Sequence, residues 1–199
     1  TANRGYDDPS IKYRDRELLN GVFVRRLPGT SFGKKNLFLR IIGQTNLLIQ
    51  SMLIGICSKR ADVVLVTTFL NFLVAPILRL TRRIPYLYWI MDLNPDQAVA
   101  SGLLKENSLQ VRLLNALQRF ALRNAHTVVS LDRYMAHRVG SKQENLTRHF
   151  ILPPWPHQNR LSLIKHGENN FRMTNNWKHK LVLMYSGNLS MVHPLTTFL

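Results

Sequence analysis

The sequence of 199 residues contains one cysteine and no metal-binding pattern. Cys57 cannot form a disulfide within this chain, so a disulfide-stapled scaffold is excluded and a reducing compartment is favoured. Neither Cys-x-x-Cys, His-x-x-His nor His-Glu-x-x-His spacing occurs, although there are seven histidines. We therefore expect no protein-bound metal.

Acidic residues are also scarce. There are 11 Asp and Glu against 27 Lys and Arg, a formal net charge of +16. This excess attracts polyanions such as nucleic acid, anionic lipid headgroups or phosphorylated substrates. The basic residues are scattered singly or in pairs, so a solvated basic face stays an alternative. A nucleic-acid-binding α/β protein without catalytic activity is the second hypothesis. It requires exposed aromatic residues, whereas Tyr86, Tyr88 and Trp89 fall in a predicted buried strand, so nucleic acid is not expected.

No stretch of about 20 residues is free of polar side chains, which a membrane-spanning helix needs. Residues 37–56 and 69–80 are the most apolar, and both are predicted to be globular helices. Polar residues interrupt the first at Arg40, Gln44, Asn46 and Gln50. It could lie on a membrane surface, because Lys34-Lys35 precede it and Lys59-Arg60 follow it.

Alternating apolar runs and helical patterns extend along the chain. Residues 1–20 are polar and rich in turn-forming residues, and residues 7–10 are predicted to be a loop. The remaining residues predict strands at 21–27, 63–67, 85–91, 126–131 and 148–152, and helices at 36–56, 71–81, 108–124 and 132–139. The run 63–67 is typical of a strand buried on both faces. This order predicts a doubly wound, Rossmann-like parallel sheet, whose ligands lie beyond the carboxyl ends of the strands.

The helix at 108–124 has the clearest amphipathic pattern. Ser108 is predicted to cap its N-terminus. Its buried stripe is predicted to consist of Leu109, Leu113, Leu117, Phe120 and Ala121.

The last residues indicate the start of a second α/β domain. Residues 181–185 are predicted to form a strand that ends at Ser186-Gly187-Asn188, a turn that leads into a helix. Three regions follow: a first Rossmann-like domain at 1–152, an interdomain linker at 153–178 with a short helix at 171–177, and the beginning of a second domain at 179–199. We expect the chain to be a fragment.

Several segments resemble one family in their order and spacing. They are TANRGYDDP, YWIMDLNPDQAVASGLL, HTVVSLDRYMAHRV, ILPPWPH and LVLMYSGNLSMVHPLTTFL. The chain resembles the retaining, nucleotide-sugar glycosyltransferases of the GT-B fold, group 1 / family 4. The resemblance implies that the first strand, its glycine-containing loop and most of the second strand precede Thr1, and that most of the donor domain follows Leu199.

The resemblance also implies an activity. A sugar passes from a nucleotide-diphosphate sugar to a glycan or lipid-linked acceptor, with retention, in the synthesis of a cell-surface polysaccharide. The leaving phosphate itself acts as the base, so neither a cofactor nor a protein nucleophile is needed. We expect a cytoplasmic enzyme, peripheral on the inner membrane face and in contact with its anionic surface, and we expect the fragment alone to be inactive.

Two carboxylates after the third predicted strand are the catalytic candidates. Asp92 and Asp96 could orient or partly deprotonate an acceptor hydroxyl. The alternative for both is capping of the helix that follows. After the next strand, Asp132 is predicted to be a helix N-cap, and Arg133 is a candidate for the cleft between the domains.

The donor candidates lie at the last turn. Ser186, Gly187 and Asn188 could bring backbone amides to the donor diphosphate. The alternative is a plain strand-to-helix turn that needs glycine for its geometry alone. Many relatives carry Arg and Lys where this chain has Asn188 and Pro194, so His193 is the remaining candidate for neutralising charge. Trp155 could stack on a sugar, but packing at the hinge between the domains is favoured.

Overall fold

The computed structural model describes residues 3–5, 8, 10–29, 32, 36–67, 71–144, 146, 148–154 and 164–185. The chain divides into two compact units, Thr1–Pro153 and Pro154–Leu199. Each unit is described by itself.

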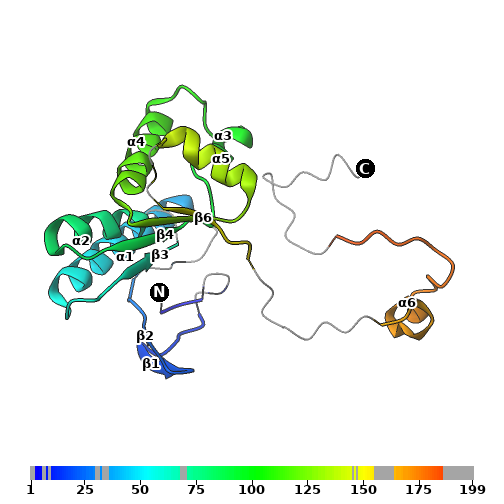
Figure 1. Cartoon of the computed structure of the whole chain (residues 1–199). Coiled ribbons are helices and arrows are strands. Elements are labelled where there is room, and N and C mark those ends of the chain that lie inside the picture. The colour runs from blue at the N-terminus through cyan, green and yellow to red at the C-terminus, as the bar shows by residue number, and fades with distance from the viewer. Residues whose placement is uncertain are drawn as a thin grey trace. The chain divides into compact units, whose positions relative to one another are not determined.

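The first unit is built on a parallel sheet (Figure 1). Its strands lie in the order β3-β4-β5-β6, and each neighbouring pair is parallel. Their bounds are Val64–Val66 for β3, Tyr86–Trp89 for β4, Thr127–Ser130 for β5 and His149–Ile151 for β6. The predicted α/β class and Rossmann-like parallel sheet are confirmed.

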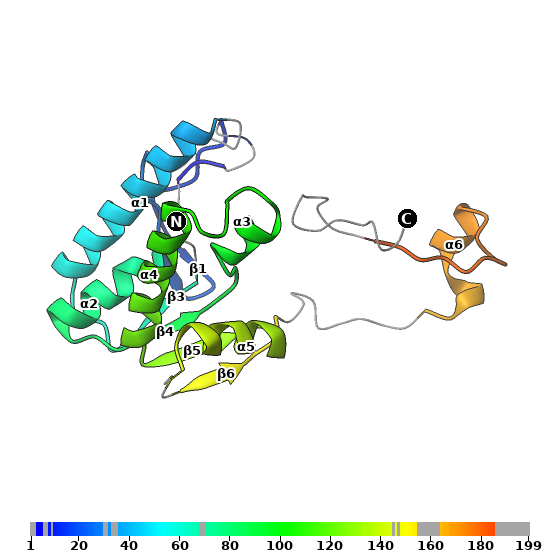
Figure 2. The same cartoon turned by 90° about the horizontal axis from the view of Figure 1, so that it is seen from above.

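Helices precede and connect these strands. They are α1 (Leu37–Cys57), the 3-10 turn η1 (Asn71–Leu73), α2 (Val74–Arg82), α3 (Asp96–Ala100), α4 (Leu109–Asn124) and α5 (Arg133–Lys142). The helix α2 packs on β3 and β4, α1 packs on α2, and α5 packs on β5 and β6 (Figure 2). The core joins β4 to η1, where the rings of Tyr88 and Phe72 stack 5.7 Å apart.

Short polar side chains set the helix starts as the sequence predicts. The Ser108 hydroxyl accepts a hydrogen bond from the Val111 amide at the start of α4. Asn36 caps α1 in the same way, with its side-chain oxygen 2.9 Å from the Phe38 amide nitrogen. Pro76 lies in the first turn of α2, where its missing N–H costs no helical hydrogen bond.

The strand predicted at 21–27 is present, but it does not belong to the parallel sheet. Strand β2 (Val22–Arg25) pairs antiparallel with β1 (Arg16–Leu19), in a separate two-stranded sheet. The sequence analysis predicts no strand at residues 16–19, which form β1. Asn20 and Gly21 both have positive φ, 50° and 82°, as the mirror-image turn of a two-residue hairpin requires. The Asn-Gly pair was the sequence signal for this hairpin.

The buried face of α4 also differs from the prediction. Leu109 and Leu113 are 80% and 57% exposed, and Phe120 is also exposed. Of the predicted stripe, Ala121 is buried and Leu117 is packed against the core. The fully buried positions are Val111, Gln118, Ala121 and Leu122. The inner face is chosen by α2 and η1, which α4 contacts, and hydrophobicity alone does not encode that choice.

The strand β3 is not buried on both faces, because Leu65 is exposed. Within the part of the chain that the structure describes, β3 is an end strand of its sheet. A continuous apolar run therefore does not by itself establish a central strand.

The helix α1 is long and apolar, and little of it is buried. By length and composition alone, Phe38–Cys57 could cross a membrane. One side is nevertheless fixed to the first unit. Gln50 donates a hydrogen bond to the Pro28 carbonyl (2.9 Å), and Asn46 donates one to the Gly29 carbonyl (2.8 Å). These polar contacts indicate a helix that lies on the unit, as the sequence predicts.

In the second unit, η2 (His166–Glu168) precedes α6 (Asn170–Thr174). The predicted helix at 171–177 is therefore shorter and begins one residue earlier. The rings of Phe171 and Trp177 meet edge to face, 5.5 Å apart. The strand predicted at 181–185 is wrong: these residues form no strand with any described residue, and Leu181 is fully exposed. A buried-type apolar run needs a neighbouring strand to become a strand itself.

Candidate functional site

The candidate site lies at the carboxyl ends of β4 and β5. These strands are neighbours and parallel, with Trp89 opposite Val129, so their carboxyl ends meet at one edge of the sheet. Asp92 follows β4 and Asp132 follows β5. Both carboxylates are exposed. This edge is where ligands of parallel α/β sheets bind.

Asp92 has the freest carboxylate at this edge. It makes no hydrogen bond or ion pair with any residue that the structure describes. Neighbouring Leu93 is buried in the core, which fixes the backbone of the turn. The Asp92 carboxylate can therefore accept a hydrogen bond from a hydroxyl group of solvent or of a ligand. Its catalytic role stays a prediction.

Asp132 caps the N-terminus of α5. One carboxylate oxygen accepts hydrogen bonds from the amides of Tyr134 and Met135, each at 2.8 Å. This is the N-cap that the sequence predicts. The Arg133 guanidinium donates to the Tyr134 hydroxyl at 2.8 Å and lies 4.8 Å from the centre of that ring. Arg133 is exposed beside the carboxyl end of β5, so its role as a cleft residue also stays a prediction.

Asp96 faces a different part of the first unit. Its carboxylate is 2.5 Å from the Lys142 ammonium, which also donates to the side-chain oxygen of Asn115 at 2.5 Å. Lys142 thereby joins α3, α4 and α5. Asp96 also lines a cavity of about 260 Å³, together with Pro95, Val99, Ala100, Glu106, Val111, Asn115 and Arg138. Asp92 and Asp96, proposed together, thus have different surroundings.

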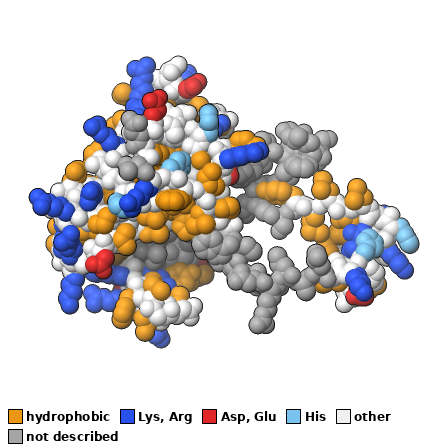
Figure 3. Space-filling view, viewed as in Figure 1, with side chains coloured by type: hydrophobic (Ala, Val, Ile, Leu, Met, Phe, Trp, Pro, Cys, Tyr) orange, Lys and Arg blue, Asp and Glu red, His pale blue; other side chains and the backbone are white. Residues whose placement is uncertain are grey.

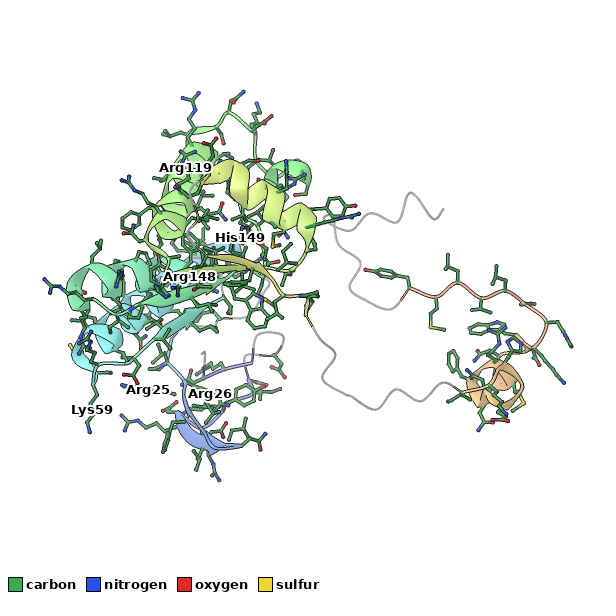
Figure 4. The ribbon with its side chains drawn as sticks, in the orientation of Figure 1. Arg25, Arg26, Lys59, Arg119, Arg148 and His149 are labelled. Atoms are coloured by element: carbon green, nitrogen blue, oxygen red, sulfur yellow. The ribbon has the colours of Figure 1, made fainter. Side chains whose placement is uncertain are left out.

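A serine–histidine pair beneath this edge was missed by the sequence analysis. The Ser130 hydroxyl is 2.8 Å from the His149 Nε2, across β5 and β6. His149 is labelled in Figure 4. Burial lowers the pKa of the His149 imidazole, which favours the uncharged ring in its hydrogen bond with Ser130. Ser130 is fully buried, so its hydroxyl cannot reach a substrate. Nothing in the local sequence pattern would have identified the pair.

The remaining site predictions fall outside the described residues. These are Trp155 and the donor candidates Ser186, Gly187, Asn188 and His193. Their roles, and the assignment of residues 179–199 to a donor-binding domain, stay predictions. Among the described residues, no group of three or more His, Cys, Asp or Glu side chains could hold a metal ion.

Two of the three aromatic residues of β4, Tyr86 and Tyr88, are buried and not available to nucleic acid, while Trp89 is half-buried. Tyr86 is fully buried, and its hydroxyl donates to the Ala121 carbonyl. Tyr88 is 3% exposed, and burial raises the pKa of its hydroxyl to about 12. Neither tyrosine ring can stack on a base, so these two residues offer no support for the nucleic-acid hypothesis.

Comparison with known proteins agrees with the fold. Residues 4–155 match the family described as "Glycosyl transferase 4-like domain". This match covers most of the chain, which therefore belongs to that family of glycosyltransferases. The chain is also similar to a protein of Pseudomonas aeruginosa named "Probable glycosyltransferase WbjE", with 25% identity over 144 residues. The match covers 71% of this chain and 36% of the relative, so the chain spans little more than a third of that protein's length.

Proposed function

We propose that this chain is the acceptor-side domain of an enzyme that transfers a sugar from a nucleotide-diphosphate sugar to a glycan or lipid-linked acceptor, with retention. The observation that carries the proposal is the exposed carboxylate of Asp92 at the carboxyl end of β4, which has no partner among the residues that the structure describes, in a domain of the glycosyltransferase 4-like family. The donor site belongs to a second domain, of which residues 179–199 are the opening.

Asp92 acts on the acceptor. Its carboxylate accepts a hydrogen bond from the acceptor hydroxyl and so increases the electron density on the attacking oxygen. The bond between the anomeric carbon and the diphosphate oxygen breaks as the acceptor oxygen bonds to that carbon. The hydroxyl proton passes to the leaving phosphate. No redox step or protein nucleophile is involved.

The location proposed for this reaction is the cytoplasmic face of a membrane, in the synthesis of a cell-surface polysaccharide. The formal net charge of +16 supports it, because Lys and Arg near an anionic bilayer are attracted by about 1 kcal/mol each. Scarcity of cysteine suits a reducing compartment.

The test uses the protein expressed from its complete reading frame. Transfer is measured from labelled nucleotide-diphosphate sugars, supplied one at a time, to a lipid extract and to soluble glycans. The wild type is expected to label one acceptor with one donor, and the 199-residue chain alone is expected to label none. Failure of every donor with the complete protein would contradict the proposal, as would an inverted anomeric configuration in the product.

A further inference from the structure

A cavity of about 260 Å³ opens between α3, α4 and α5 in the first unit. This volume has room for several water molecules, and therefore for one small ligand. Figure 1 shows the three helices close together, above the parallel sheet. The reaction proposed at Asp92 gives this cavity no role, so its occupant has to be inferred from its lining.

The lining of the cavity combines apolar and polar side chains. The apolar residues are Pro95, Val99, Ala100 and Val111. The polar residues are Asp96, Glu106, Asn115 and Arg138. Apolar walls with a few polar groups are typical of sites that bind small molecules, because the walls exclude water and the polar groups orient the ligand.

Three of the polar residues have groups that are available to a ligand. Neither Glu106 nor Arg138 makes a hydrogen bond or an ion pair with any residue that the structure describes. The side-chain oxygen of Asn115 accepts a hydrogen bond from the Lys142 ammonium, which leaves the amide NH2 group of Asn115 as a donor. The cavity therefore offers a carboxylate acceptor together with guanidinium and amide donors.

The charges around the cavity balance. Lys142 pairs with Asp96 at 2.5 Å. Glu106 and Arg138 carry opposite charges. A phosphate in this cavity would meet one guanidinium and two carboxylates, so an anion is not favoured, although the whole chain has a formal net charge of +16. The lining therefore suits a neutral ligand that both donates and accepts hydrogen bonds, as a hydroxylated ring does.

The backbone around Glu106 is held by hydrogen bonds on both sides. The Leu104 amide donates to the Ala98 carbonyl at 3.1 Å. The Ser108 amide donates to the Lys105 carbonyl at 3.0 Å. In Figure 3 acidic side chains are visible at the upper end of the first unit, where Figure 1 places the segment between α3 and α4. Because this segment is ordered in advance, it loses less conformational entropy when a ligand binds.

The cavity is also close to the edge of the sheet that holds Asp92. Pro95 lines the cavity and follows Asp92 by three residues, which span at most about 11 Å. A glycan with one sugar residue at Asp92 is therefore long enough to place another residue in the cavity.

We propose that this cavity binds a neutral sugar residue of the acceptor glycan. Hydroxyl groups of the ring donate hydrogen bonds to the Glu106 carboxylate and accept them from Arg138 and Asn115. The C–H groups of the ring pack against the apolar wall, which includes Val99 and Ala100. The inference rests on the proposed function and narrows its acceptor to a glycan that carries a neutral sugar.

The experiment measures binding of simple sugars to the 199-residue chain, without a donor, by saturation-transfer NMR. The neutral probes are the methyl α-glycosides of glucose, galactose and mannose, and N-acetylglucosamine. The anionic probes are glucose 1-phosphate and glucuronate. At least one neutral probe is expected to bind in the millimolar range, as a ligand of this size does, and more tightly than either anionic probe.

Variants of the lining place this binding in the cavity. Glu106→Gln and Arg138→Met are each expected to weaken it by about tenfold, since each removes a hydrogen bond to a charged group. Ala100→Phe fills the cavity without changing its charge and is expected to abolish binding. The matched controls are Glu144→Gln and Arg119→Met, at exposed residues outside the cavity, and both should bind as the wild type does. Glu106, Arg138 and Ala100 are exposed, so circular dichroism melts should coincide.

Three outcomes would overturn the inference. They are no binding of any neutral probe, binding to Ala100→Phe that equals binding to the wild type, and tighter binding of the anionic probes than of the neutral ones. Failure of the proposed function is seen separately, because binding is measured without a donor. If the complete protein transfers sugar but Glu106→Gln leaves its KM for the acceptor unchanged, the inference fails and the proposed function stands. If a neutral probe binds but no donor supports transfer, the proposed function fails and the cavity still binds sugar.

Discussion

The Lys142 ammonium lies 2.5 Å from the Asp96 carboxylate, although 46 residues separate them in the sequence. Their side chains are 13% and 22% exposed, so the pair is largely shielded from water. With Asn115 as its second acceptor, Lys142 fastens the start of α3 to α4 and to the end of α5. Asp96 thus has an identified role in the fold of the first unit.

Removing either partner of this pair should destabilise the first unit. We expect Asp96→Ala and Lys142→Met each to lower the free energy of unfolding by about 1–2 kcal/mol, after allowance for partial exposure. Urea denaturation measures this, and a double-mutant cycle should show coupling. Equal stability of wild type and Asp96→Ala, combined with lost transfer in the complete protein, would instead support a catalytic Asp96.

Asp92→Asn should have the opposite profile. Asp92 is exposed and has no partner among the described residues, so the urea midpoint is expected to stay unchanged. Transfer by the complete protein should fall by about 10²-fold or more, because a neutral amide accepts the hydrogen bond of the acceptor hydroxyl more weakly than a carboxylate does. The control is Glu144→Gln, an exposed carboxylate beyond the end of α5. Equal activity of Asp92→Asn and wild type would remove Asp92 from the mechanism.

The stability of the first unit should depend on pH through His149. Burial lowers the pKa of its imidazole in the folded state, whereas the unfolded ring titrates at about 6.5. Above that pH the ring is unprotonated in both the folded and the unfolded state, so protonation of His149 takes nothing from the free energy of unfolding. As the pH falls below about 6.5, the unfolded state binds the proton first and stability decreases.

The measurement compares urea midpoints at about pH 7.5 and 5.5, on either side of the ordinary histidine pKa. We expect His149→Gln to show a smaller loss on acidification than the wild type. His137→Gln, at an exposed histidine of α5, is the matched control and should behave as the wild type does. A wild-type midpoint that rises on acidification through this range would contradict the assignment.

Gly21 should resist substitution. Its φ of 82° is strained for any residue with a Cβ, so Gly21→Val is expected to cost about 1–2 kcal/mol of hairpin stability. Amide hydrogen exchange at β1 and β2 reports this locally. Gly140→Ala is the control. An added Cβ there meets no atom within 4 Å, and alanine favours the helix α5 by up to about 1 kcal/mol. Unchanged exchange in Gly21→Val would show that the turn is not required.

Local chemistry explains which features the sequence predicted. Helix starts at Ser108 and Asp132 follow from side-chain oxygens within reach of nearby amides, and the parallel sheet follows from alternating strand and helix patterns. The position of Asp92 at a strand end follows from the same alternation. Family membership depends on extended segments of the sequence and was likewise accessible without the structure.

Contacts between distant segments decided the rest. The sequence placed Asp92 and Asp96 together as one pair of carboxylates, and only the approach of α5 assigned Asp96 to Lys142. Likewise, Leu109 and Val111 are both apolar residues of α4, but packing against α2 and η1 selects which one is buried. The hydrogen bond between Ser130 and His149 is the clearest example of a feature that the sequence could not predict. It forms because β5 pairs with β6, and the register of that pairing brings together two residues that no sequence pattern relates.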